Sequence, residues 1–79
     1  MEFKKGDRII WDSGFGFEIG RFIEDSEHQM YGSYKVNLIT GVVQGESLRP
    51  SSEIKPLNEE TIKEVSKKYK CNINFRFDN

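Results

Sequence analysis

Residues 6–23 have the sequence GDRIIWDSGFGFEIGRFI. Two runs of aliphatic and aromatic residues, 8–11 and 17–24, flank a short stretch that contains two glycines and Phe15. That stretch contains residue types that favour turns, and glycine adopts positive φ there without steric cost. The alternation of the second run is imperfect around Gly20, which favours a bulge or a bend at that point. The stretch therefore predicts two β-strands joined by an aromatic turn.

The next segments continue the β pattern as far as Pro56. Alternation over residues 34–39 predicts a third strand, and Thr40-Gly41 predicts a tight hairpin into a fourth strand over residues 42–46. Residues 49–52 contain a proline and predict a turn, which leaves room for a very short fifth strand over residues 54–56. Residues 1–57 are thus expected to form a small five-stranded β-barrel.

After Pro56 the apolar period changes to that of a helix. Asn58 is a favourable N-cap, and the two glutamates after it suit the positive end of a helix dipole. We therefore predict an α-helix over residues 58–69 with an apolar stripe formed by Ile62, Val65 and Tyr69. The spacing also predicts i,i+4 ion pairs between Glu59 and Lys63 and between Glu64 and Lys68.

The last segment returns to a period of two. Cys71, Ile73, Phe75 and Phe77 alternate with polar residues, which predicts a short final β-strand over residues 71–77. Its phenylalanines should pack on another surface, because their exposure to water is unfavourable. The strand would either extend the protein's own sheet or pair with a second copy to form a homodimer. In either case Cys71 is expected to be a small buried hydrophobe.

The composition restricts the class of protein. The chain has 79 residues, which fit a single domain spanning 1–79, with 1–57 as the barrel and 58–79 as a C-terminal extension. One cysteine cannot form an intramolecular disulfide, and this suits a reducing, cytoplasmic setting. No apolar run approaches the roughly 20 residues of a membrane-spanning helix, so no membrane partner is expected.

The charges are unevenly distributed. The formal net charge is −1, which weakens the case for a nucleic-acid ligand. Residues 1–54 contain six basic and nine acidic residues, whereas residues 55–79 contain six basic and four acidic residues. A basic surface is therefore expected mainly on the C-terminal extension.

The N-terminal strand pattern resembles that of a known family of domains. The run Gly6-Asp7-Arg8-Ile9-Ile10, followed by Gly16-Phe17-Glu18-Ile19-Gly20-Arg21-Phe22, is similar to the opening of SH3-like small barrels of the Tudor and KOW kind. The similarity covers about residues 4–57. The resemblance implies an SH3-like barrel that binds other molecules, such as methylated side chains, proline-rich peptides, RNA or proteins, and it implies no catalysis.

The resemblance also implies where a ligand would bind. Tudor-like domains place an aromatic cage on loops of the barrel, and the matching aromatics here lie on the first and third loops. A cation over such rings gains about 0.5 to 2 kcal/mol per good contact, and nearby carboxylates would complement it. The candidate partner-binding residues are Trp11, Asp12, Phe15, Phe17, Glu18, Tyr31 and Tyr34. Phe15 lies between two glycines in the predicted turn and is the aromatic residue for which we most expect exposure.

These observations predict a non-catalytic, regulatory module that binds a protein or a peptide through its aromatic loop. The alternative is an RNA- or DNA-binding KOW-like module that uses Lys4, Lys5, Arg8 and the helix lysines. Catalysis is not expected, because the single histidine and the single cysteine lie in different predicted elements. We also expect no cofactor and no metal, because no second histidine or cysteine completes a site with His28.

Overall fold

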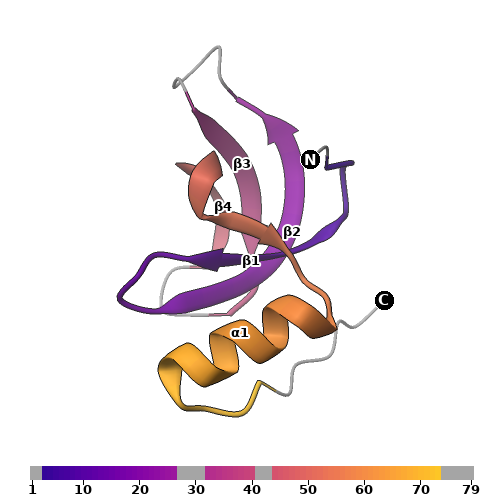
Figure 1. Ribbon diagram of the computed structural model, residues 1–79. Helices are drawn as coiled ribbons and strands as arrows, with labels where there is room; N and C mark the ends of the chain where they lie inside the picture. Colours follow the sequence, from indigo (N-terminus) through magenta and orange to yellow (C-terminus); the bar gives the residue numbers. More distant parts are fainter. Residues whose placement is uncertain (1–2, 27–31, 41–43, 74–79) are drawn as a thin grey trace.

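The computed structural model describes residues 3–26, 32–40 and 44–73 (Figure 1). The described part is mainly β, with one α-helix, as predicted. Its elements, in chain order, are β1 (Arg8–Asp12), β2 (Phe17–Asp25), β3 (Ser33–Leu38), β4 (Gly45–Pro50), the 3₁₀ turn η1 (Ser51–Glu53), β5 (Ile54–Pro56) and α1 (Glu59–Tyr69).

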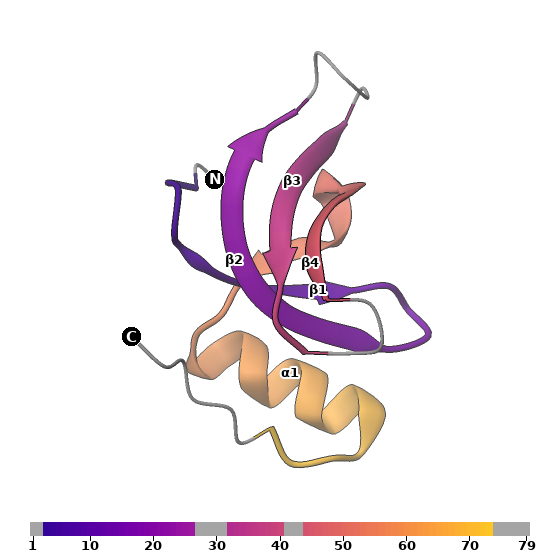
Figure 2. The same cartoon turned by 180° about the vertical axis from the view of Figure 1, so that it is seen from behind.

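The five strands form one antiparallel sheet in the order β4-β3-β2-β1-β5. β2 is the longest strand and curves strongly, so that the sheet wraps around its own inner face (Figures 1 and 2). β4 and β5 are the two edges of this sheet and do not pair with each other along their described residues. The sheet is therefore curved but open, and closure into a barrel is not observed.

Gly20 marks the place where β2 and β3 approach most closely. A Cβ atom at this position would lie 2.2 Å from the carbonyl oxygen of Asn37, which is backbone and cannot move aside. The expected bulge is not at Gly20 itself, because this residue pairs regularly with Ile9 and Leu38. The register of β2 on β3 instead shifts between Phe22 and Glu24. Glycine at position 20 thus permits close strand contact, and the bulge lies further along β2.

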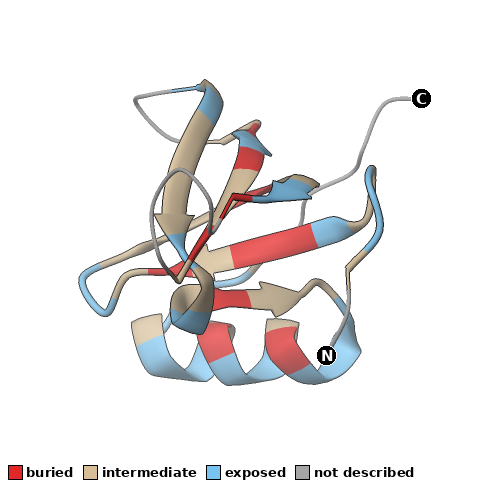
Figure 3. Cartoon of the chain, turned by 90° about the horizontal axis from the view of Figure 1, so that it is seen from above, coloured by how far each residue is buried: buried red, intermediate tan, exposed pale blue. Residues whose placement is uncertain are grey.

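The hairpin of β1 and β2 is buried on both faces. Side chains on its inner face join a core inside the curved sheet, which consists of Ile9, Phe22, Val36, Leu38 and Ile54. Side chains on its other face meet α1 in a second core, which consists of Ile10, Ile19 and Val65. Figure 3 shows that the buried residues of α1 face the sheet, whereas the opposite helix face is exposed. We call these the inner core and the helix core.

The helix begins as the sequence predicts. The side chain of Asn58 accepts a hydrogen bond from the amide of Thr61, and the Thr61 hydroxyl accepts one from the amide of Asn58. This reciprocal capping satisfies two backbone donors that the first turn of a helix leaves unpaired. The helix ends at Tyr69, and Lys70 adopts the left-handed conformation with φ of 53°.

The fourth strand lies later in the chain than predicted. β4 starts at Gly45 and includes Pro50, where we expected a turn, while residues 41–43 lie outside the described part. Proline lacks an amide hydrogen and is normally excluded from sheets, but an edge strand tolerates it. Pro50 and Pro56 both lie on edge strands of this sheet.

Both predicted helix ion pairs are wrong. Glu64 instead pairs with Lys55 of β5 at 3.9 Å, and Lys68 pairs with Asp12 of β1 at 2.9 Å. Glu59 forms no ion pair with Lys63 in the part of the chain that the structure describes. For Glu64 and Lys68 the reason is that the sheet offers each side chain an oppositely charged partner across the helix–sheet interface.

The predicted final strand is not observed where the chain is described. Residues 71–73 have no regular secondary structure, and residues 74–77 lie outside the described part. Cys71 is exposed, so the expectation of a buried thiol is wrong. Ile73 does pack against the helix core. The left-handed turn at Lys70 redirects the chain along α1 (Figures 1 and 2) and leaves Cys71 in solvent.

Candidate functional site

The turn between β1 and β2 is held by a compact set of hydrogen bonds. The Ser13 hydroxyl donates to the carbonyl of Gly16 at 3.0 Å and accepts from the amides of Phe15 and Gly16 at 3.3 and 3.2 Å. The amide of Ser13 also donates to the carbonyl of Gly16 at 2.9 Å. Gly14 has a φ of +90°, which an L-residue with a side chain rarely adopts. Residues 12–17, which we call the hairpin tip, therefore have a defined backbone conformation.

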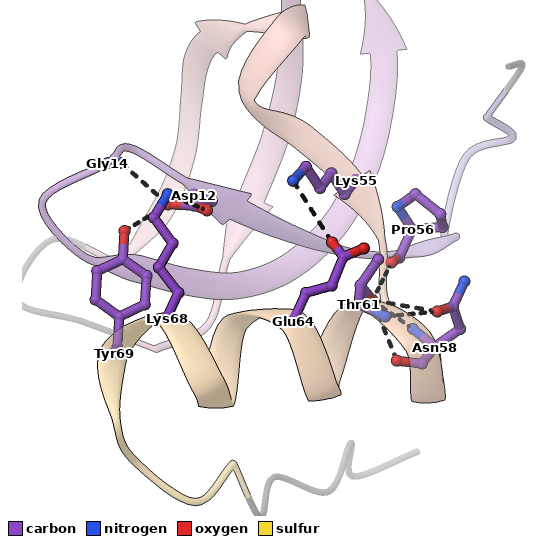
Figure 4. A network of polar contacts seen from close by, with 9 residues as sticks. All are labelled: Asp12, Gly14, Lys55, Pro56, Asn58, Thr61, Glu64, Lys68 and Tyr69. Atoms are coloured by element: carbon purple, nitrogen blue, oxygen red, sulfur yellow. Dashed lines mark hydrogen bonds and ion pairs between the residues drawn. The ribbon is translucent and has the colours of Figure 1, made fainter.

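Asp12 attaches the hairpin tip to the end of α1 (Figure 4). Its carboxylate accepts hydrogen bonds from the Tyr69 hydroxyl at 2.5 Å, from the Lys68 amine at 2.9 Å and from the Gly14 amide at 3.0 Å. The Tyr69 hydroxyl also lies 3.1 Å from the carbonyl oxygen of Gly16. We call Asp12, Lys68 and Tyr69 the helix latch. It joins residues more than fifty positions apart and fixes the tip against the helix.

The helix latch changes the pKa of each of its members. Burial alone would raise the pKa of Asp12, but the hydrogen bonds from Tyr69, Lys68 and Gly14 stabilise the carboxylate and lower its pKa from 3.8 to about 2. The hydrogen bond with Asp12 raises the pKa of Lys68, and the bond to the same carboxylate raises the pKa of Tyr69. At neutral pH the latch therefore contains a carboxylate, an ammonium group and a neutral phenol.

Phe15 lies at the apex of the hairpin tip and is 100% exposed. It is the only exposed large hydrophobic side chain among the described residues. Single apolar side chains on a surface are common, but this one is attached to a backbone with fixed hydrogen bonds. The expectation that Phe15 is exposed is confirmed.

Trp11 has partners within the protein. Its indole nitrogen donates to Glu53 at 2.9 Å, and the guanidinium carbon of Arg49 lies 4.4 Å from the centre of its ring. Arg49 thus provides an internal cation–π contact, which occupies one face of the indole. This side chain packs against the inner core.

The remaining candidate residues are divided between the two faces of the sheet. Phe17 packs against the helix core and lies 5.5 Å from the Tyr69 ring, measured between centroids. Tyr34 packs against the inner core, 5.2 Å from the Phe22 ring. Glu18 is half-buried and pairs with Trp11 in the register of β1 and β2. Tyr31 lies outside the described residues. The described candidate aromatics therefore do not converge on one cage.

Sequence reasoning missed the residues that support the site. Tyr69 was expected only as part of an apolar stripe, and Lys68 as the partner of Glu64. The missed signal is the Tyr69 hydroxyl, because a half-buried tyrosine on an apolar face usually finds a hydrogen-bond acceptor for its phenol. The partners of Trp11 were missed because Arg49 and Glu53 lie about forty residues further along the chain.

The described ranges contain no group of three or more His, Cys, Asp or Glu side chains arranged to hold a metal ion. Within the same ranges, α1 is too short and too polar to cross a lipid bilayer.

No protein-family model, curated protein or solved structure significantly matches the chain.

Proposed function

We propose that this protein is a non-catalytic, cytoplasmic module of the SH3-like small-barrel kind that binds another protein through Phe15. The observation that carries the proposal is a fully exposed phenylalanine on a turn whose backbone is hydrogen-bonded to the Ser13 side chain. The wrapped antiparallel sheet, with its first two strands joined at this turn, supports the SH3-like assignment.

The energetics of association favour such an arrangement. Aromatic side chains inserted into a partner's pocket often provide a large share of the binding energy, because they bury large apolar areas and have few rotatable bonds. A backbone that is already ordered before binding loses less conformational entropy on association. The Ser13 hydrogen bonds and the helix latch provide this order for Phe15. The partner should therefore offer an apolar pocket that accepts one phenyl ring.

We propose a smaller set of contact residues than the sequence predicts. Three of the candidate aromatics pack against the two cores, namely Trp11, Phe17 and Tyr34, and Asp12 is bonded within the helix latch. We therefore propose that these four residues support the hairpin tip and do not contact the partner directly. We retain Phe15 as the contact residue and Glu18 as a neighbour on the same hairpin. Tyr31 stays a prediction.

A photo-crosslinking experiment tests this proposal. Benzoylphenylalanine would replace Phe15 in one variant and the exposed Glu24, on the far end of β2, in a matched control. After illumination in the native cytoplasm, we expect one protein to be crosslinked from position 15 and not from position 24. The purified partner should then bind Phe15→Ala at least about tenfold more weakly than wild type, and Phe15→Leu should lose less affinity. Equal affinity of wild type and the folded Phe15→Ala variant would reject the assignment.

A further inference from the structure

Three lysines lie on the outer face of α1 and at its C-terminal cap. Lys63 and Lys67 are one turn apart on the same side of the helix, and Lys70 is the cap residue that follows Tyr69. All three are exposed. Within the described residues none of them forms an ion pair, whereas Lys68 pairs with Asp12 of β1. Among the residues that the structure describes, no carboxylate is therefore paired with these three lysines.

The lysines border an open groove of about 470 Å³. Its other lining residues are Ile62 and Ser66 of α1 and Cys71 and Asn72 of the segment that turns back along the helix. More of its surface is apolar than polar, although its rim is basic. We call this the outer groove. It can receive a short chain segment with apolar side chains on one side and negative charges on the other.

Lys70 occupies a position at which glycine is usually preferred. Helices often end with a residue in the left-handed conformation, and a side chain there costs about 1 kcal/mol relative to glycine. Here the residue is a lysine with φ of 53°, and the amides of Lys70 and Cys71 both bond to the carbonyl of Ser66. The third positive charge of the groove is thus placed at a position where the backbone itself would favour glycine.

We propose that the outer groove binds an acidic segment of another protein, one in which glutamate or aspartate alternates with apolar residues. The three exposed lysines would face its carboxylates, and Ile62 would contact its apolar side chains. A nucleic acid fits less well, because none of the described residues that line the groove is an aromatic residue on which a base could stack. This inference is independent of Phe15.

Two-dimensional amide NMR tests the proposal with a defined probe. The probe is a capped peptide of alternating glutamate and leucine, titrated into the full chain at about 50 mM salt. We expect the largest shift changes at Ile62, Ser66, Cys71 and Asn72, and weaker binding as salt rises. An oligothymidylate of similar length and charge should bind more weakly. Absence of binding, shifts elsewhere on the protein, or preferential binding of the oligothymidylate would each overturn the proposal.

Matched charge variants locate the interaction. Lys63→Gln with Lys67→Gln should weaken peptide binding by about tenfold, because two favourable charge contacts are lost. Lys4→Gln with Lys5→Gln removes the same charge from two exposed lysines outside the groove and should leave affinity within about twofold. Equal weakening by the two pairs would indicate only nonspecific electrostatic attraction and would overturn the assignment.

Lys70→Gly separates binding from stability. The substitution relieves the left-handed conformation and should raise the melting temperature by a few degrees, while it weakens peptide binding several-fold. A purely structural role for Lys70 predicts no loss of affinity in a protein that has become more stable. Unchanged affinity of this variant would therefore contradict the proposed role of Lys70 in the groove.

Discussion

Ile9 and Ile10 are neighbours in β1, and both are completely buried, yet they belong to different cores. The inner core joins residues from four strands of one sheet, so its side chains are held in place by the hydrogen-bonded ladders between those strands. The helix core instead joins two strands to a helix that forms no backbone ladder with them. The comparison shows that the two faces of one β-strand can be buried differently, one within the curved sheet and the other under a helix.

The helix core contains fewer buried apolar residues than the inner core, and polar contacts supplement it. Val65 is the only buried hydrophobic residue that α1 contributes among the described residues. Polar contacts supplement it, namely the helix latch at one end and the Glu64–Lys55 pair on the flank (Figure 4). We therefore expect α1 to separate from the sheet before the sheet itself unfolds.

The largest expected effect comes from truncating the two isoleucines in turn. Ile9→Ala should lower the free energy of unfolding by about 3 kcal/mol and Ile10→Ala by about 2 kcal/mol, because each leaves a cavity in a different core. Native-state hydrogen exchange should show faster exchange throughout the sheet for Ile9→Ala. For Ile10→Ala it should show the greatest acceleration in α1. The same exchange pattern in both variants would refute the division into two cores.

Gly20→Ala should destabilise the protein by about 2 kcal/mol. An added methyl group would collide with the backbone carbonyl of Asn37, so β2 and β3 would have to separate. Gly16→Ala is the matched control, since nothing lies within 4 Å of a Cβ atom built there. Its effect should stay within about 0.5 kcal/mol in denaturant unfolding. Similar losses in the two variants would contradict a steric requirement specific to Gly20.

Asp12→Asn should lower the free energy of unfolding by about 1 to 2 kcal/mol at neutral pH, because the ionised carboxylate is preferentially stabilised in the folded state. The figure is reduced for solvent screening, since the Lys68 side chain is 50% exposed. Glu18→Gln is the control, because it removes a carboxylate from the same hairpin without breaking these bonds.

The pH dependence of stability gives a second measurement of the latch. Folding lowers the pKa of Asp12 from 3.8 to about 2. The contribution of this carboxylate to the free energy of unfolding is therefore complete above its unfolded pKa and is lost as the pH falls through about 2. Wild type should therefore lose its advantage over Asp12→Asn between about pH 5 and pH 2. A constant difference between the two proteins across this range would contradict the assigned pKa.

The smallest expected effect concerns Phe15. Phe15→Ala should change the free energy of unfolding by no more than about 0.5 kcal/mol, because its side chain is fully exposed. Phe17→Ala, two residues away, should cost about 2 kcal/mol, because that ring packs against Tyr69 in the helix core. Thermal unfolding of both variants provides the measurement, and a large destabilisation by Phe15→Ala would argue against its role as a displayed contact.

Much of the fold could be predicted because its signals are local. The strand pattern over residues 8–24, the N-cap at Asn58 and the exposure of Phe15 depend on residues within a few positions of one another. The limits of β4 could not be predicted, because the place of Pro50 depends on whether its strand is an edge. The exposure of Cys71 could not be predicted, because the left-handed residue that redirects the chain is Lys70 and not a glycine, the residue type that would have indicated such a turn.

The amino-acid sequence by itself determined the elements of this protein: the turn that displays Phe15, the strands beside it and the start of the helix. Hydrophobic period, turn residues and caps act over short distances along the chain, and that is why a sequence reveals them. The tertiary structure alone decided which charged groups meet. Asp12 bonds to Lys68 and Tyr69, and Lys63, Lys67 and Lys70 face solvent, because packing the helix on the sheet determines which of its sides can reach a carboxylate.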